Sequence, residues 1–469
     1  MIKLYLYNTL AHQKQNFVPL QNQQVGLYTC GPTVYNFAHI GNLRTYLFED
    51  ILKRTLTYFE FQVKHVMNIT DVGHLTDDAD NGDDKMEKAA ILEQKNAWEI
   101  ADFYTQSFKK DLASLNIQEP NIWCKATDHI KEQIEAIQKI EANGFIYRTD
   151  DGIYFDTSKL PDYGELARLD IKGLQAGHRI DLGQKKNPTD FALWKFSKPL
   201  EKRQMEWSSP WGKGFPGWHI ECSAMSAHYL GLPFDIHCGG IDHIPVHHAN
   251  EIAQTKAAEN KSLANYWLHG EFLIINEARM GKSANNFITL QSLAEKQILP
   301  LAYRYFVLGT HYRQKLNFSW EGLQQAQQAL FNLYEQIENL PEATKPLPDF
   351  VNSFNQIIAD DLNTPQVLAL LWNLVKSSAQ PAEKAATIYL FDEILGLKLK
   401  ATTLYLQKKN STVPSEIILL LKDRQIARQN KNWDLSDQLR KKIENYGYRI
   451  TDQSTEQILL KIPTYSDLA

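Results

Sequence analysis

The order of apolar segments in the first 70 residues restricts the fold of this chain more than any other feature. A short apolar run at 24–29 leads into Cys30-Gly-Pro-Thr33. Leucines and isoleucines then recur at helical spacing, and a second apolar run follows at 61–69. Two strands joined by a helix form a βαβ unit, which is the start of a parallel sheet. The sequence therefore predicts an α/β fold.

The rest of the chain changes character several times. Apolar residues at helical spacing predict one long amphipathic helix over 85–115. Residues 116–205 are mixed, with a hairpin signal at Asp151-Gly152, and predict an inserted subdomain. From 316 to 400 the apolar stripes are helical and predict a packed helix bundle.

Composition and charge exclude several classes of protein. The chain of 469 residues is 43% apolar, which excludes a disordered or collagen-like protein. Its longest apolar run has six residues, at 367–372, whereas a membrane span needs roughly 20. No signal peptide is evident, so we expect a cytoplasmic protein. Four cysteines are too few for a disulfide scaffold, so those with a role are expected to be ligands or nucleophiles.

Charge is distributed unevenly along the chain. The net charge is −5, from 50 Lys+Arg and 55 Asp+Glu. Residues 71–87 hold seven acidic residues and one Lys, which predicts a solvated acidic loop. An EF-hand is disfavoured there because Ala79 and Lys88 fall at ligand positions. Residues 401–450 instead hold 10 Lys+Arg and 5 Asp+Glu, a net +5, which indicates either a solvated helix face or a module for a polyanionic partner.

Two short motifs suit the binding of phosphate groups. His39-Ile-Gly-Asn42 stands at the predicted start of the first helix, where unpaired amides and the helix dipole favour anions. Arg279-Met-Gly-Lys-Ser283 offers two cations in a flexible loop, which suits a mobile clamp on a leaving pyrophosphate. Each motif alone also fits an ordinary helix start or a solvated basic loop.

A third set of residues has the chemistry of metal ligands. His247 and Glu251 stand four apart, so on a helix both reach one ion. Cys30 closes the first strand, and Cys222 lies in Gly217-Trp-His-Ile-Glu-Cys222. Two thiolates, one imidazole and one carboxylate suit zinc. The alternative is that both cysteines are small buried core residues.

These motifs together resemble a known family. His39-Ile-Gly-Asn42 and Arg279-Met-Gly-Lys-Ser283 are similar to the two signatures of class I aminoacyl-tRNA synthetases. Further segments resemble the cysteinyl-tRNA synthetase family: Cys30-Gly-Pro-Thr-Val-Tyr35, Asn68-Ile-Thr-Asp71, Asp190-Phe-Ala-Leu-Trp-Lys195, Gly217-Trp-His-Ile-Glu-Cys-Ser-Ala-Met225, Phe234-Asp-Ile-His237 and Asp361-Leu-Asn-Thr-Pro365. The match runs in order over essentially the whole chain.

The resemblance implies a Rossmann-like catalytic domain in two halves, 1–115 and 206–315, with 116–205 inserted, a bundle at 316–400 and an anticodon-binding module at 401–469. It implies ATP-dependent attachment of L-cysteine to its tRNA, in a cytoplasmic monomer, through a cysteinyl-adenylate. Mg²⁺ is expected with ATP. The alternatives are a ligase that joins cysteine to an amino sugar and a non-catalytic RNA-binding paralogue. The continued match beyond residue 340 disfavours the amino-sugar ligase.

The resemblance also assigns residues to roles. One Zn²⁺ would be held by Cys30, Cys222, His247 and Glu251, and would bind the cysteine substrate as thiolate, which a serine hydroxyl cannot imitate. The remaining assignments follow in order: cysteine contacts from Gly31, Thr70, Trp218 and His237; ATP contacts from His39, Gly41, Asp242, Arg279 and Lys282; and catalysis by His39, Asn42 and Lys282. From the residues alone, Thr70, Trp218 and His237 fit structural roles better.

Departures from the family pattern include three positions of the two signatures, and also Cys238, Ala249 and an acidic insertion at Asp77 to Asp84. Asn42 stands where the signature has a second His, Arg279 where it has Lys, and Gly281 where it has Ser. In the C-terminal module, the resemblance assigns base stacking to Trp433 and base hydrogen bonding to Asp437. Asp434 is expected to cap this helix, and packing is the alternative role for Trp433.

Overall fold

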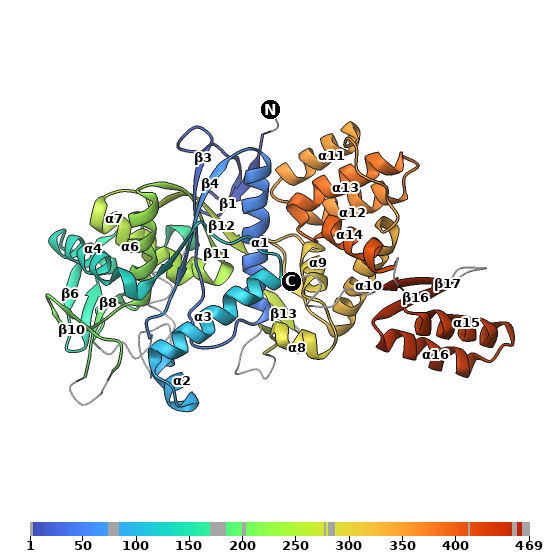
Figure 1. Cartoon of the computed structure of the whole chain (residues 1–469). Helices are drawn as coiled ribbons and strands as arrows, with labels where there is room; N and C mark the ends of the chain where they lie inside the picture. Colours follow the sequence, from blue (N-terminus) through green and yellow to red (C-terminus); the bar gives the residue numbers. More distant parts are fainter. Residues whose placement is uncertain are drawn as a thin grey trace.

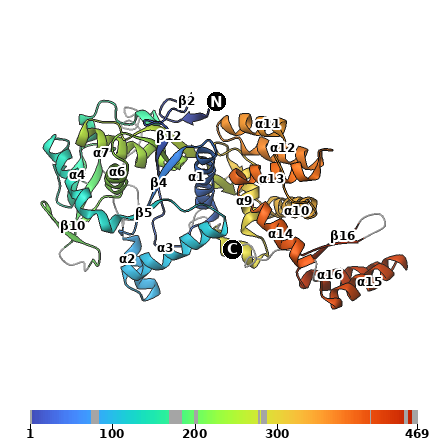
Figure 2. The same ribbon diagram turned by 45° about the horizontal axis from the view of Figure 1, so that its top comes forward.

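The computed structural model describes residues 3–73, 84–168, 184–198, 203–275, 278–279, 287–410, 413–452 and 457–461. The molecule is elongated in both views (Figures 1 and 2). A five-stranded parallel sheet lies in its central part, helices α11 (Pro348–Ala359) to α14 (Leu399–Asn410) lie to one side, and the C-terminal elements form one end.

The central sheet confirms the predicted βαβ unit. Its strand order is β12-β11-β3-β4-β5, and every neighbouring pair is parallel. The strands are β3 (Gln24–Thr29), β4 (Gln62–Ile69), β5 (Ile122–Lys125), β11 (Phe234–Gly240) and β12 (Ala264–Gly270). Helix α1 (Ile40–Tyr58) joins β3 to β4. The carboxyl ends of β3, β4 and β11 therefore lie side by side, where α/β sheets bind their ligands.

Two hydrophobic clusters cover the sheet. One contains Leu43 and Leu47 of α1 and continues into the helix bundle. The other contains Tyr28, Ile220 and Trp267, and includes residues of α4 (Ile130–Ala142), α6 (Trp218–Leu230) and α7 (Ala249–Glu259). Helices on both faces explain why consecutive residues of β4 and β11 are buried, rather than alternate ones.

The prediction of one continuous helix over 85–115 is wrong, because the structure has two helices in this range. Helix α2 spans Lys85–Glu93 and α3 spans Ala97–Ser114. Gln94 adopts a left-handed conformation with φ 54°, which ends α2. Asn96 then starts a new capping box with Glu99, so the local capping signals overrode the continuous apolar spacing.

An antiparallel sheet forms the second β layer, with strand order β6-β7-β8-β10-β9. Its strands are β6 (Ile146–Arg148), β7 (Gly152–Phe155), β8 (Phe191–Phe196), β9 (Trp207–Ser209) and β10 (Gly212–Pro216). The antiparallel sheet does not coincide with the limits 116–205 expected for the inserted subdomain. Strand β5 pairs with the parallel sheet, whereas β9 and β10 belong to the antiparallel one.

The chain after β12 is mainly helical, as expected. Short strands β13 (Leu273–Ile275), β14 (Ala278–Arg279) and β15 (Leu316–Asn317) form a small sheet, and β1 (Tyr5–Asn8) pairs with β2 (Gln13–Asn16). The helices are α8 (Leu290–Glu295), α9 (Pro300–Leu308), α10 (Trp320–Ile337), α11 (Pro348–Ala359), α12 (Thr364–Lys376), α13 (Pro381–Leu395) and α14 (Leu399–Asn410). Among the described helices, none has both the length and the apolar character that crossing a membrane requires.

The C-terminal module contains α15 (Ser415–Gln429), α16 (Trp433–Asn445) and a hairpin of β16 (Tyr448–Asp452) and β17 (Gln457–Lys461). It has its own small core around Ile417 and Ile443. The expected cap Asp434 is wrong: the side chain of Asn432 accepts the hydrogen bond from the Leu435 amide, and Asp434 lies in the first turn. Both residues favour helix starts, so sequence alone did not separate them.

Candidate metal centre and active site

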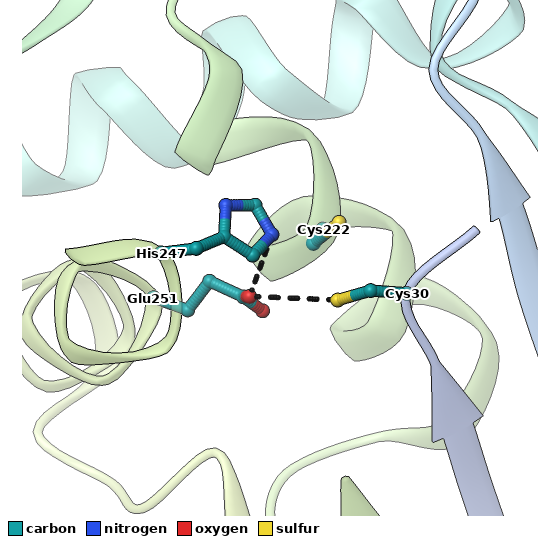
Figure 3. Close-up of side chains that lie close together, drawn as sticks. All are labelled: Cys30, Cys222, His247 and Glu251. Atoms are coloured by element: carbon teal, nitrogen blue, oxygen red, sulfur yellow. Dashed lines mark hydrogen bonds and ion pairs between the residues drawn. The ribbon is translucent and has the colours of Figure 1, made fainter. Parts of the chain in front are cut away.

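Four residues from distant parts of the sequence meet beside the carboxyl end of β3. Cys30 follows β3, and Cys222 lies in α6. His247 lies in the short π-helix Ile244–His248, and Glu251 lies in α7, which follows it directly. One ligand atom from each lies within 4.8 Å of the others, and all four residues are buried. Figure 3 shows the four side chains pointing toward one another. This is the set predicted from the sequence.

The distances within this cluster suit a shared ion. His247 Nε2 lies 3.0 Å from Glu251 Oε1, as the i,i+4 spacing predicts, and Cys30 Sγ lies 4.0 Å from the same oxygen. Burial, followed by contact with Cys222, raises the pKa of the Cys30 thiol, and burial also raises the pKa of the Cys222 thiol. Two buried thiols and a carboxyl crowded together favour a bound cation, which would stabilise their charged forms.

A second set shares Cys30 and Glu251 and adds His237 and His248. His237 Nε2 lies 2.9 Å from Glu251 Oε2, and His248 Nε2 lies 3.4 Å from Cys30 Sγ. His248 in turn contacts His269, at 2.8 Å. Burial lowers the pKa of His248 and of His269, so both rings are neutral. These contacts orient the donor groups of the cluster.

The residues expected to contact cysteine surround this cluster. Gly31 follows Cys30, and a Cβ there would lie 1.6 Å from the Asn68 carbonyl oxygen, so the position requires glycine. The Trp218 ring stacks on His247, with centroids 4.4 Å apart. Thr70 is buried at the end of β4, and its hydroxyl bonds Glu221 and Asn68. The structure thus brings Gly31, Thr70, Trp218 and His237 together.

The first signature opens α1 as predicted. His39 is its N-cap and accepts from the Asn42 amide at 3.1 Å, while Asn42 Oδ1 accepts from the His39 amide at 3.3 Å. Asn42 therefore completes a capping box. Gly41 lies in the first turn, and Asp242 is exposed in the turn after β11.

The second signature is described only at its edges. Lys282 and the rest of 280–286 lie outside the described residues, as does 74–83 of the acidic loop. The Arg279 backbone pairs with Ile274 in β13. After the segment, the Ile288 carbonyl accepts from the Ile40 amide at 2.8 Å, and the Phe287 ring packs edge-on against His39. Residues 287 and 288, which follow this segment, therefore lie at the start of α1.

Known proteins are similar to this chain over most of its length. The family model described as tRNA synthetases class I (C) catalytic domain matches residues 16–328. Cysteine–tRNA ligase 1 of Burkholderia lata is 52% identical over 97% of this chain and 96% of its own length. Cysteine–tRNA ligase of Treponema denticola is 45% identical over 97% and 98%. This chain belongs to the cysteine–tRNA ligase family of class I synthetases.

Solved structures share the fold at low identity. A Mycobacterium tuberculosis methionyl-tRNA synthetase in complex with methionyl-adenylate has a TM-score of 0.54 at 15% identity, covering 81% of this chain and 90% of that one. An Agrobacterium radiobacter LeuRS–tRNA–LeuAMS complex has a TM-score of 0.59 at 11% identity, covering 82% and 85%. The predicted Rossmann-like class is confirmed.

The C-terminal residues of this family member are placed on a surface. Trp433 is 57% exposed, and the Arg428 guanidinium lies 5.9 Å from its ring centroid. Asp437 is also exposed, one turn further along α16. An exposed ring beside a cation suits a flat, negatively charged ligand.

Sequence reasoning missed two buried residues of the site, Asn68 and Glu221. Both stand inside motifs that the family resemblance used, next to Ile69 and Cys222. Their roles depend on contacts between residues up to 151 positions apart, which neither spacing nor composition reveals.

Proposed function

We propose that this chain joins L-cysteine to its tRNA in two steps, first forming cysteinyl-adenylate from ATP and then transferring the cysteinyl group to the terminal ribose. The observation that carries the proposal is the buried cluster of two thiols, an imidazole and a carboxyl beside the carboxyl end of β3, in a chain of this family. We further propose that it acts as a cytoplasmic monomer.

The donor set fits Zn²⁺, because thiolate, imidazole and carboxylate are its ordinary ligands and their ligand atoms already lie within 4.8 Å. Bound zinc would supply a soft site for the substrate thiolate. Shape alone separates such close neighbours as cysteine and serine by only about 1–3 kcal/mol. Cys30, Cys222, His247 and Glu251 would therefore carry the selection, while Trp218 and His237 hold the ligand side chains in place.

The start of α1 supports a role in holding the triphosphate. Its first turn includes the Gly41 amide, and the helix dipole favours phosphate there. We assign His39, Gly41, Asn42, Asp242 and Arg279 to the ATP side of the site. Lys282 is assigned to the charge that develops on the departing pyrophosphate. Mg²⁺ would accompany ATP.

The C-terminal module supports tRNA as the acceptor. Residues 401–450 carry a net charge of +5, and Trp433 and Asp437 lie exposed on one helix. We assign base stacking to Trp433 and hydrogen bonding to a base to Asp437. A small amino-sugar acceptor would leave this surface without a role.

Cysteine-dependent exchange of pyrophosphate into ATP tests the first step, and charging of purified tRNA tests the second. We expect exchange with cysteine but not with serine, and transfer to tRNA that is lost on replacing Trp433 by Ala. Absence of exchange in zinc-loaded protein would contradict the enzyme, and exchange without charging would favour the amino-sugar ligase.

The first mutational prediction concerns Lys282. Lys282→Ala should lower the exchange rate by about 100-fold or more, because one group that stabilises transition-state charge typically contributes that factor. Zinc content should stay unchanged. The control is Lys131→Ala, which removes an exposed lysine whose ion pair is worth little. A normal exchange rate in the Lys282 variant would remove this residue from the mechanism.

A further inference from the structure

A line of hydrogen bonds connects the residues next to Cys30 and Cys222, the two cysteines proposed as metal ligands. The Gly31 amide donates to Asn68 Oδ1 at 2.8 Å, Asn68 Nδ2 bonds Thr70 Oγ1 at 3.0 Å, and Thr70 Oγ1 bonds Glu221 Oε2 at 3.0 Å. Gly31 follows Cys30 and Glu221 precedes Cys222. The line therefore joins the neighbours of both sulfur ligands through the end of β4.

The direction of every bond in this line is determined by its first member. A backbone amide only donates, so Asn68 must present its oxygen to Gly31 and its NH₂ group to Thr70. The Thr70 hydroxyl consequently accepts from Asn68 and donates its single hydrogen to the Glu221 carboxylate. One lone pair of Thr70 is left, so Thr70 can receive a further hydrogen bond but cannot give one.

This direction decides which part of cysteine Thr70 can bind. The thiolate and the carboxylate of cysteine only accept hydrogen bonds, whereas its α-ammonium only donates. Thr70, Asn68 and Glu221 are at most 1% exposed, so water does not compete for these bonds and the hydroxyl cannot easily rotate.

We propose that Glu221 is a positioning residue that makes Thr70 an acceptor for the α-ammonium group of the cysteine substrate. This inference rests on the proposed function. By taking the Thr70 hydrogen, Glu221 directs the free lone pair to the substrate and sets the distance between the ammonium position and the metal ligands.

The test uses two cysteine analogues as inhibitors of cysteine-dependent exchange: cysteamine, which lacks the carboxylate, and 3-mercaptopropionate, which lacks the ammonium group. In Glu221→Ala, the KM for cysteine and the inhibition constant of cysteamine should both rise by about 10- to 100-fold, the usual effect of losing a hydrogen bond to a charged group. The inhibition constant of 3-mercaptopropionate, the KM for ATP and the zinc content should change by less than about twofold.

Three further variants keep the inference testable if Glu221→Ala does not fold. Glu221→Gln keeps an oxygen that accepts from Thr70 and should retain cysteine binding, whereas Thr70→Val lacks the acceptor and should show the same selective loss of cysteamine. Ser226→Ala is the matched control, because Ser226 is buried in the same helix and bonds the Ser223 carbonyl. It should leave both analogues unchanged.

Equal weakening of both analogues, or of neither, in Glu221→Ala or Thr70→Val would overturn the inference, as would a cysteamine loss in Glu221→Gln as large as in Thr70→Val. Absence of cysteine-dependent exchange in the wild-type protein would instead contradict the proposed function. The two failures are therefore distinguishable.

Discussion

Two buried polar clusters differ in how their charges are balanced. On the α1 side of the sheet, the Arg304 guanidinium donates to Asp50 Oδ2 at 2.6 Å and to the Leu395 and Leu115 carbonyls at 2.6 and 2.9 Å. Arg54 donates to the same Asp50 oxygen at 2.8 Å. In the metal centre, the neighbours of Glu251 are thiols and imidazoles.

The difference separates a structural cluster from a functional one. Burial raises the pKa of Asp50, but Arg304 and Arg54 lower it by more, so the carboxylate stays charged and paired. The cluster is complete within the protein and ties α1 to α9, to the loop before β5 and to the end of α13. The thiol cluster instead groups four ligand atoms closely enough to hold a cation.

The largest expected effect concerns the cluster of Arg304, Arg54 and Asp50. Arg304→Ala should lower the free energy of unfolding by about 3–5 kcal/mol, because it leaves the buried Asp50 charge without its main partner. Urea denaturation measures this change. The control is Arg428→Ala, whose pair with Asp452 is partly exposed and is worth less than about 1 kcal/mol. A loss below about 1 kcal/mol in the Arg304 variant would show that this cluster is not the stabilising one.

The second prediction tests the cluster that needs a cation. Cys222→Ala should weaken zinc binding by at least about 100-fold, which corresponds to about 2.7 kcal/mol of lost stabilisation when zinc is in excess. Metal analysis after dialysis and thermal unfolding with and without zinc measure the two effects. Cys124→Ala is the matched control, since Cys124 is buried and contacts the Met67 carbonyl outside the cluster. Full zinc content in the Cys222 variant would contradict the ligand set.

The smallest predicted effect uses Glu49, the neighbour of Asp50 in α1. Glu49 is 1% exposed, and among the described residues neither of its carboxyl oxygens has a hydrogen-bond partner. Burial raises the pKa of Glu49 well above its usual range. Between the unfolded pKa, about 4.3, and this raised value, the folded state binds the extra proton, so stability falls as pH rises.

Glu49→Met removes this penalty and should therefore stabilise the protein by about 1–2 kcal/mol at pH 8, with a smaller gain at pH 5. Asp50→Asn should instead destabilise the protein, because Asp50 is paired and its pKa is lowered. Unfolding curves at the two pH values measure the difference. If the gain in stability from Glu49→Met does not increase with pH, this would contradict the interpretation of Glu49 as a buried carboxyl without a compensating partner.

Local signals predicted the elements and the ligands. The apolar runs around α1 gave β3 and β4, and the four-residue spacing of His247 and Glu251 placed both on one helical face. Local signals also competed: Gln94 interrupts an apolar stripe that runs through it, and Asn432 caps where Asp434 was expected.

Contacts between distant segments were out of reach of spacing arguments. The bond between Thr70 and Glu221 depends on how β4 and α6 pack, and Arg304 meets Asp50 across 254 positions. Burial of the four candidate ligands in one place required the parallel sheet to bring strand ends together, which the sequence indicated only as a fold class.

The distance along the chain between Cys30 and Glu251 has a consequence for synthesis of the protein. The two residues are 221 positions apart, and a ribosome adds roughly 5–20 residues per second, so about 10–45 s pass between them. Until Glu251 and His247 have emerged, the first thiol has no complete set of partners. The proposed metal site is therefore assembled late, only once more than half of the polypeptide has been translated.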